Sequence, residues 1–213
     1  RLGEEPPEGK CFRGSGFSPN TSVIGHNGLT LALVEAGISP MSLTYDLETI
    51  GYTNFEGTLP GAFTAHTKFD PIAEELHGVC YAYPDIPDRV QHVIVGMDNR
   101  VTKVTDVPLE GMPMIHDMSL TKKYALIYDL PVCVDIEMAM AGKRFPFAWS
   151  DEHEPRVGLL PRDGEAKDII WCEAPKCYVF HPVNAFDVET SDGNSKVIVD
   201  LCRFNRMFHS DLH

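Results

Sequence analysis

Short runs of alternating apolar and polar residues, separated by turn residues, occupy most of this 213-residue chain. Such alternation predicts β-strands, because successive side chains of a strand point to opposite faces. Asn27-Gly28 lies between two of these runs and predicts a tight hairpin turn. The predicted strands cover residues 22–26, 29–35, 39–47, 62–68, 78–83, 91–97, 101–107, 156–161, 168–173, 178–188 and 196–204.

Residues 114–131 predict a further hairpin, with its turn at Thr121-Lys122-Lys123. If the first arm is a strand, His116 shares a face with Met114 and Met118, so its imidazole lies in an apolar row. A buried polar group costs free energy unless it finds a partner. The partner of His116 could be a backbone carbonyl, a carboxylate or a metal ion.

The succession of short strands predicts an all-β fold, and only residues 132–146 suggest a helix. Hairpins that follow one another as meanders favour the blades of a β-propeller over a sandwich or a barrel. The chain shows no internal repeat and no linker, so a single domain over residues 1–213 is predicted.

Composition narrows the possible partners. A net charge of −13 disfavours nucleic acid and anionic lipid, which both require a basic surface. No run of about 18 apolar residues occurs, so no transmembrane helix is predicted. Six cysteines without a CxxC pair are expected to be reduced thiols, which predicts a cytoplasmic location.

Three of the nine histidines lie in apolar β segments: His66 in FTAHTKFDP, His116 in MIHDMSLT and His181 in YVFHPVNAFD. Their spacing differs from that of a zinc finger or an HExxH helix. It suits successive propeller blades that each direct one imidazole toward a common axis. The alternative is three independent core histidines.

Other polar residues are assigned from their local context. Glu35 ends an apolar row and could accept the second N–H of a metal-bound imidazole, or be a solvated strand end. Asp117 falls on the opposite face from His116, where bonding to neighbouring strands is favoured over catalysis. Surface or rim positions are expected for His77, His92 and His153.

These segments resemble the carotenoid cleavage oxygenase family in its bacterial form, which includes apocarotenoid- and lignostilbene-cleaving dioxygenases. The matching segments occur in the family's order and cover residues 20–37, 63–71, 113–131, 156–164 and 177–187. The resemblance implies a seven-bladed β-propeller with an axial Fe(II), held by four histidines that three glutamates help to orient. It further implies that His66, His116 and His181 are metal ligands and that Glu35 is the first orienting glutamate.

The resemblance also implies that this chain is a central part of a longer protein, about three to four blades of the seven. The fourth histidine and the other two glutamates of the family lie beyond it, and His209 and His213 lack the matching context. The 213-residue segment alone is therefore expected to be inactive. It is also expected to bind iron weakly and to associate through unpaired strand edges.

The function implied by the resemblance is a non-haem Fe(II) dioxygenase. It would cleave one C=C bond of a carotenoid or apocarotenoid with O2, giving two carbonyl products without an external reductant. Val34 stands before Glu35 where stilbene-cleaving members tend to carry lysine, which favours an apolar polyene. Peripheral membrane contact through regions outside this chain stays open.

Three other functions remain as alternatives. The first is a lignostilbene-type dioxygenase that cleaves phenylpropanoids. The second is a non-catalytic propeller that binds a ligand, with structural histidines and a solvated Glu35. A zinc hydrolase is a remote third, because no general base is placed beside the histidines.

Overall fold

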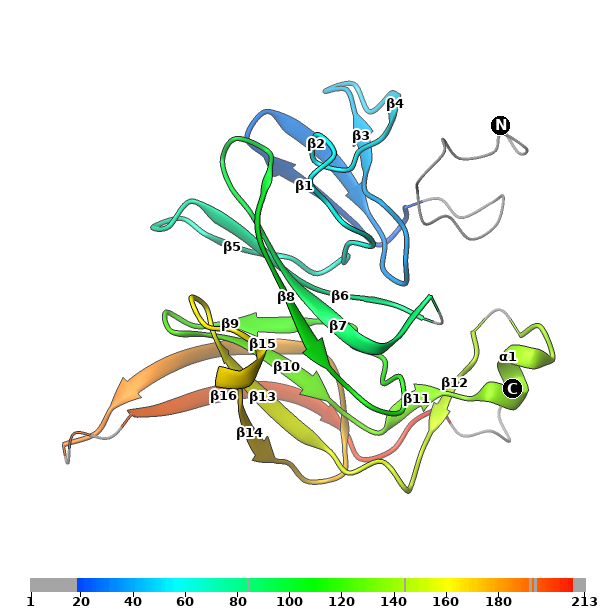
Figure 1. The fold of residues 1–213 in the computed structure, drawn as a ribbon, viewed down its shortest axis with the longest axis vertical. Coiled ribbons are helices and arrows are strands. Elements are labelled where there is room, and N and C mark those ends of the chain that lie inside the picture. The colour runs from blue at the N-terminus through cyan, green and yellow to red at the C-terminus, as the bar shows by residue number, and fades with distance from the viewer. Residues whose placement is uncertain (1–18, 84, 144, 192, 194, 209–213) are drawn as a thin grey trace. The chain divides into compact units, whose positions relative to one another are not determined.

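The computed structural model of the chain describes residues 19–83, 85–143, 145–191, 193 and 195–208, and these contain sixteen strands (Figure 1). The all-β prediction is confirmed. The strands are β1 (Ser22–His26), β2 (Leu29–Leu33), β3 (Met41–Leu43), β4 (Thr49–Tyr52), β5 (Lys68–Asp70), β6 (Glu75–Ala82), β7 (Ile86–Val95), β8 (Val101–Pro108), β9 (Met118–Leu120), β10 (Tyr124–Asp129), β11 (Val132–Val134), β12 (Phe147–Trp149), β13 (Arg156–Pro161), β14 (Ile170–Glu173), β15 (Tyr178–Glu189) and β16 (Ser195–Phe204).

The chain divides into two compact units, the first ending at Asp106 within β8 and the second beginning at Val107. The first unit is built on two four-stranded antiparallel meanders, β1-β2-β3-β4 and β5-β6-β7-β8. Asn27 and Gly28 both have positive φ (34° and 78°), as a primed hairpin turn requires, so the predicted β1–β2 hairpin is confirmed. The prediction of a single domain stays a prediction.

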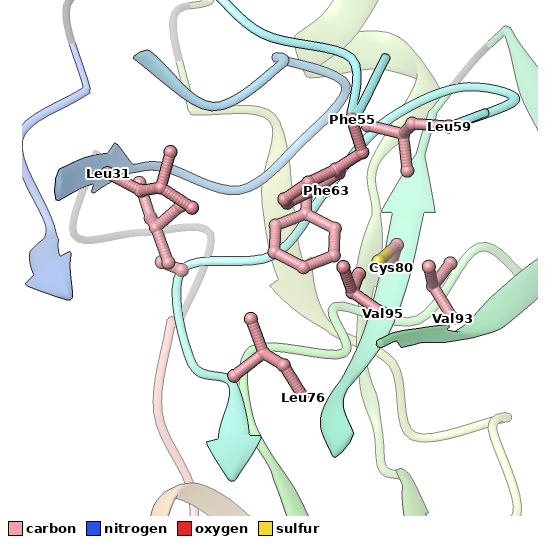
Figure 2. Packing of buried hydrophobic residues seen from close by; sticks show 10 residues of the cluster. Leu31, Phe55, Leu59, Phe63, Leu76, Cys80, Val93 and Val95 are labelled. Carbon is pink, nitrogen blue, oxygen red and sulfur yellow. The ribbon is translucent and has the colours of Figure 1, made fainter. Parts of the chain in front are cut away.

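The core of the first unit gathers side chains from strands and from the loop between β4 and β5 (Figure 2). Phe55 and Phe63 come from this loop and meet edge to face, with ring centroids 5.1 Å apart. The strand predicted over 62–68 was wrong, because residues 62–67 serve this packing and the strand begins only at Lys68. Burial among these apolar side chains raises the pKa of the Cys80 thiol well above its ordinary value.

The opposite face of β6 and β7 is buried as well, which corrects the predicted surface or rim position of His77 and His92. Both side chains are inaccessible, and His77 Nδ1 lies 3.1 Å from His92 Nε2. His77 Nε2 lies 3.3 Å from a carboxylate oxygen of Glu75. Almost every residue of β6 is buried, so the alternation of polar and apolar positions could not show which face meets solvent.

The second unit contains a four-stranded sheet in the order β14-β13-β10-β9, with two-stranded sheets β11-β12 and β15-β16. The predicted turn at Thr121-Lys122-Lys123 is confirmed, since Ala125 pairs with Leu120 across it. The first arm begins later than predicted, at Met118. Residues 114–117 lead into it as an extended segment, in which the backbone N–H of Met114 donates to Val132 O at 2.7 Å.

The helix predicted over 132–146 is mostly absent from the described residues. Val132–Val134 form β11, because two valines flanking a cysteine favour pairing with β12. The α-helix α1 covers only Ile136–Met140, and the Asp135 side chain caps it by accepting from Met138 N at 2.9 Å. A short 3₁₀ helix, η1 (Ala166–Asp168), precedes β14. Among the described residues, no helix has the length and apolar character needed to cross a membrane.

Two buried groups of the second unit predict a loss of stability at alkaline pH. Burial raises the pKa of Tyr128 to about 12, with the charge of Asp117 adding to the rise and a Ser119 hydrogen bond opposing it. Burial, with the charge of Asp129, raises the pKa of Cys133 to about 12. Both groups are neutral when protonated, so their contribution to the free energy of unfolding is complete below the unfolded pKa values of about 8.5–10. This contribution is lost as the pH rises toward the pKa values of the folded state.

We therefore expect the melting temperature of the full-length protein to fall between about pH 9 and pH 12. In Tyr128→Phe, the free energy of unfolding that is lost at high pH should be smaller by roughly 2–3 kcal/mol, because two pKa units correspond to that free energy. Thermal melts across the pH range, with phenolate absorbance followed in parallel, measure both effects. An identical alkaline slope in the wild type and Tyr128→Phe would rule out this origin.

Candidate metal centre

Two of the histidines predicted as ligands lie side by side in the second unit. His116 belongs to the extended segment before β9, and His181 lies near the start of β15. Their ring centroids are 5.0 Å apart with an interplanar angle of 63°. A ring nitrogen of His116 lies within 4.8 Å of a ring nitrogen of His181. The fold thus joins two imidazoles that are 65 residues apart in sequence.

Aromatic packing supports this histidine pair. The ring of Phe180 meets that of His116 edge to face at 5.0 Å, and meets Tyr178 in the same way at 5.1 Å. The buried Tyr178 hydroxyl donates to Met114 O at 3.1 Å. This bond ties the start of β15 to the segment that carries His116.

A second tie joins β15 to the β9–β10 turn. Asp187 accepts from Thr121 Oγ1 and from the backbone N–H of Lys123, each at 3.1 Å. With a tie on each side of His181, β15 is held against the segment that carries His116. The relative placement of the two imidazoles therefore follows from hydrogen bonds that do not involve the rings themselves.

Asp117 lies in direct contact with His181, a role that the sequence analysis missed. Its side chain is only 5% exposed, and Oδ2 lies 3.1 Å from His181 Nδ1. Oδ1 accepts from the backbone N–H of Met118 at 2.6 Å. The alternation rule misled here, because residues 114–117 are not a regular strand. The available signal was the position of a carboxylate directly after a candidate ligand.

His66 and Glu35 belong to the first unit. His66 is half-buried two residues before β5, and its backbone N–H donates to Thr64 Oγ1 at 3.3 Å. Glu35 is half-buried two residues after the end of β2. Since both lie in a different unit from the histidine pair, their roles at a metal centre stay predictions.

The remaining histidines have structural contacts or lie outside the described residues. His26 Nε2 lies 3.0 Å from Gly96 O, beside the turn formed by Asn27 and Gly28. His153 is partly buried, which agrees with the predicted surface or rim position, and its Nε2 lies 2.6 Å from Asp129 Oδ1. His209 and His213 fall outside the described part of the chain.

The contacts of His116 and His181 fit a transition-metal ion. Imidazole nitrogens are good ligands for iron, zinc and copper, so the residue type alone does not choose among these metals. Metal-bound histidines usually donate their second N–H to a carboxylate or a carbonyl, which is the contact that His181 makes with Asp117.

Known proteins resemble this chain along nearly its whole length. Residues 4–213 match the family model described as retinal pigment epithelial membrane protein. The carotenoid cleavage oxygenase of Mycobacterium tuberculosis is 36% identical over an alignment of 231 positions. This alignment covers 91% of this chain and 46% of that relative. The isoeugenol monooxygenase of Pseudomonas putida is 32% identical, covering 85% of this chain and 37% of the relative.

Solved structures show the same fold. The lignostilbene dioxygenase of Pseudomonas brassicacearum has a TM-score of 0.75 and 26% identity, over 89% of this chain and 45% of that one. Cobalt-substituted Synechocystis ACO has a TM-score of 0.76 at 22% identity, over 98% and 45%. The predicted class, an all-β part of a seven-bladed propeller, is thereby confirmed. The chain spans less than half the length of these relatives.

Proposed function

This chain belongs to the retinal pigment epithelial membrane protein family, that of the carotenoid cleavage oxygenases, and we propose that the whole protein is a non-haem Fe(II) dioxygenase. Its substrate would be a carotenoid or an apocarotenoid. The observation that carries this proposal is the pair His116 and His181, with the carboxylate of Asp117 on the second nitrogen of His181.

The residues proposed to hold Fe(II) are His66, His116 and His181, with Glu35 as an orienting carboxylate. When bound, Fe(II) supplies the O2 chemistry that converts one C=C bond into two C=O groups, with no external reductant. The experiments below use the full-length protein, because the family resemblance implies further ligands beyond this chain.

The residues of this chain position both imidazoles and cover that of His116. Phe180 packs edge to face on His116, so an apolar ring lies where water would otherwise solvate the imidazole. Asp117 fixes the His181 ring by accepting its N–H. Neither contact asks for a polar group on the substrate, which is compatible with a hydrocarbon polyene.

Val34 favours the polyene over a hydroxystilbene, because valine offers no charge or hydrogen bond to a phenol oxygen. The net charge of −13 supports a partner other than nucleic acid. We also propose a cytoplasmic protein, with peripheral membrane contact through regions outside this chain.

The test is product analysis with the full-length protein loaded anaerobically with Fe(II). A carotenoid, an apocarotenoid and a hydroxystilbene are each incubated with 18O2, and the products are identified by mass. We expect two carbonyl fragments from a polyene, with label from O2. Cleavage of the stilbene alone would support the phenylpropanoid alternative. A protein that binds no metal and cleaves none of the three would support the non-catalytic propeller.

A further inference from the structure

The loop that carries His66 is held in the core of the first unit. Residues 62–65, which directly precede His66, are each 3% exposed or less. Phe63 packs edge to face on Phe55, and its backbone N–H donates to Ile38 O at 3.3 Å. The backbone that leads into His66 therefore has a fixed position, set by packing within the first unit alone.

Thr64 contributes the one polar side chain of residues 62–65. Its hydroxyl oxygen accepts a hydrogen bond from the backbone N–H of His66 at 3.3 Å. Threonine readily forms such a bond to an N–H two residues further along the chain. The Thr64 side chain is 2% exposed, so water cannot easily replace this acceptor if the hydroxyl is removed.

Gly78 of β6 determines how the Thr64 side chain is oriented. A Cβ at Gly78 would lie 2.7 Å from Thr64 Cγ2, which is closer than van der Waals contact allows. The glycine thus leaves the space that the threonine methyl occupies. A β-branched side chain has few staggered orientations, so seating the methyl beside Gly78 directs the hydroxyl to the His66 N–H.

We propose that Thr64 is a positioning residue for His66, whose hydroxyl holds the His66 backbone and so sets the direction in which the imidazole leaves the loop. This inference rests on the proposed function for its metal, but the bond itself is present in the metal-free protein. A ligand that is already oriented does not have to be ordered when the metal binds, which favours binding. Thr64 acts through the backbone of His66, so its role does not depend on the protonation of the ring.

The first measurement is titration of the metal-free full-length protein with Co2+ alone. Thr64→Val keeps the shape of the side chain and removes the acceptor. We expect it to bind Co2+ about 2–10-fold more weakly, the fold-change that corresponds to one hydrogen bond. Thr64→Ser keeps the hydroxyl and loses only the methyl beside Gly78, so its affinity should lie closer to that of the wild type. Thr64→Ala takes the place of Thr64→Val if the latter does not fold.

The matched control is Thr58→Val, which removes the same kind of bond from the same unit. Thr58 Oγ1 accepts from the backbone N–H of Val101 at 2.8 Å, so its partner is not a proposed ligand. This variant should lower the melting temperature, as Thr64→Val does, but leave the Co2+ affinity unchanged. A purely structural role of Thr64 would give the two variants the same Co2+ affinity.

The second measurement is hydrogen exchange of the His66 amide in the metal-free protein labelled with 15N-histidine. Exchange should be faster in Thr64→Val than in the wild type and in Thr64→Ser. Unchanged exchange in Thr64→Val, or a Co2+ affinity equal to that of the wild type, overturns the role of Thr64. A wild type that binds no metal overturns the proposed function, and the exchange of the His66 amide still decides whether Thr64 holds this backbone.

Discussion

Replacing Asp129 by alanine is expected to lower the free energy of unfolding of the full-length protein by about 1–3 kcal/mol, the usual cost of leaving hydrogen-bonding groups without their partner. Asp129 ends β10 and its side chain is 1% exposed. One carboxylate oxygen lies 2.6 Å from His153 Nε2, and the other accepts from Arg156 Nε at 2.8 Å. Arg156 in turn stacks on Trp171, with its guanidinium carbon 4.0 Å from the ring centroid.

The effect has a definite physical cause. Without Asp129, the Arg156 guanidinium, which stacks on Trp171 and is 37% exposed, loses its carboxylate, and His153 Nε2 loses its partner. Asp129→Asn should cost less, because the amide keeps one acceptor for one of the two donors. Chemical denaturation of the wild type and of both variants gives the difference directly.

Asp151→Asn is the matched control for this experiment. Asp151 also accepts from an arginine at 2.8 Å, but its side chain is 59% exposed and its partner, Arg206, is 46% exposed. Solvent screens such a pair, so the free energy of unfolding is expected to stay nearly unchanged. Equal small effects at Asp129 and Asp151 would show that burial does not govern this network.

Local signals predicted much of the fold. Asn27-Gly28 is a turn because both residues tolerate positive φ, and at Thr121-Lys122-Lys123 the threonine hydroxyl accepts from the backbone N–H groups of Lys123 and Tyr124. β13 spans residues 156–161 as predicted, because a valine and two leucines favour an extended chain. β4 (Thr49–Tyr52) was missed, since Gly51 weakens its pattern and a register irregularity breaks its pairing with β3.

The failures share one cause: tertiary packing overrides local pattern. Residues 62–67 have the composition of a strand but are used to fill the core of the first unit around Phe63. The short helix α1 and the strand β11 divide a segment that looked helical as a whole. His77 and His92 are polar in sequence yet fully buried, because each satisfies a ring nitrogen of the other.

The candidate site was predictable to the extent that it depends on motifs. The segments around His116 and His181 identified both residues, and the second unit brings their rings to 5.0 Å. The contact between Asp117 and His181 joins positions 64 residues apart, so periodicity could not predict it, and the local signal was only the position of Asp117 directly after His116. The geometry also depends on the bond from Tyr178 to Met114 O, which is equally invisible to periodicity.

Replacing His116 or His181 by alanine is expected to abolish stable Fe(II) binding by the full-length protein. Each substitution removes an imidazole from the proposed ligand set. Loss of an outer partner alone costs roughly 10–100-fold in metal affinity, and loss of the ligand itself should cost more. Iron content after anaerobic loading and gel filtration measures the effect, and C=C cleavage should fall in parallel.

The control for these variants is His26→Gln, which changes another histidine with a long-range backbone contact. The amide of glutamine can still bond Gly96 O, so iron content should match that of the wild type. Added imidazole should restore part of the binding in His181→Ala, because the substitution vacates the space of one imidazole ring beside His116. Misfolding would not be rescued in this way. Stoichiometric iron in both alanine variants would exclude the pair as ligands and remove the main support for the proposed enzyme.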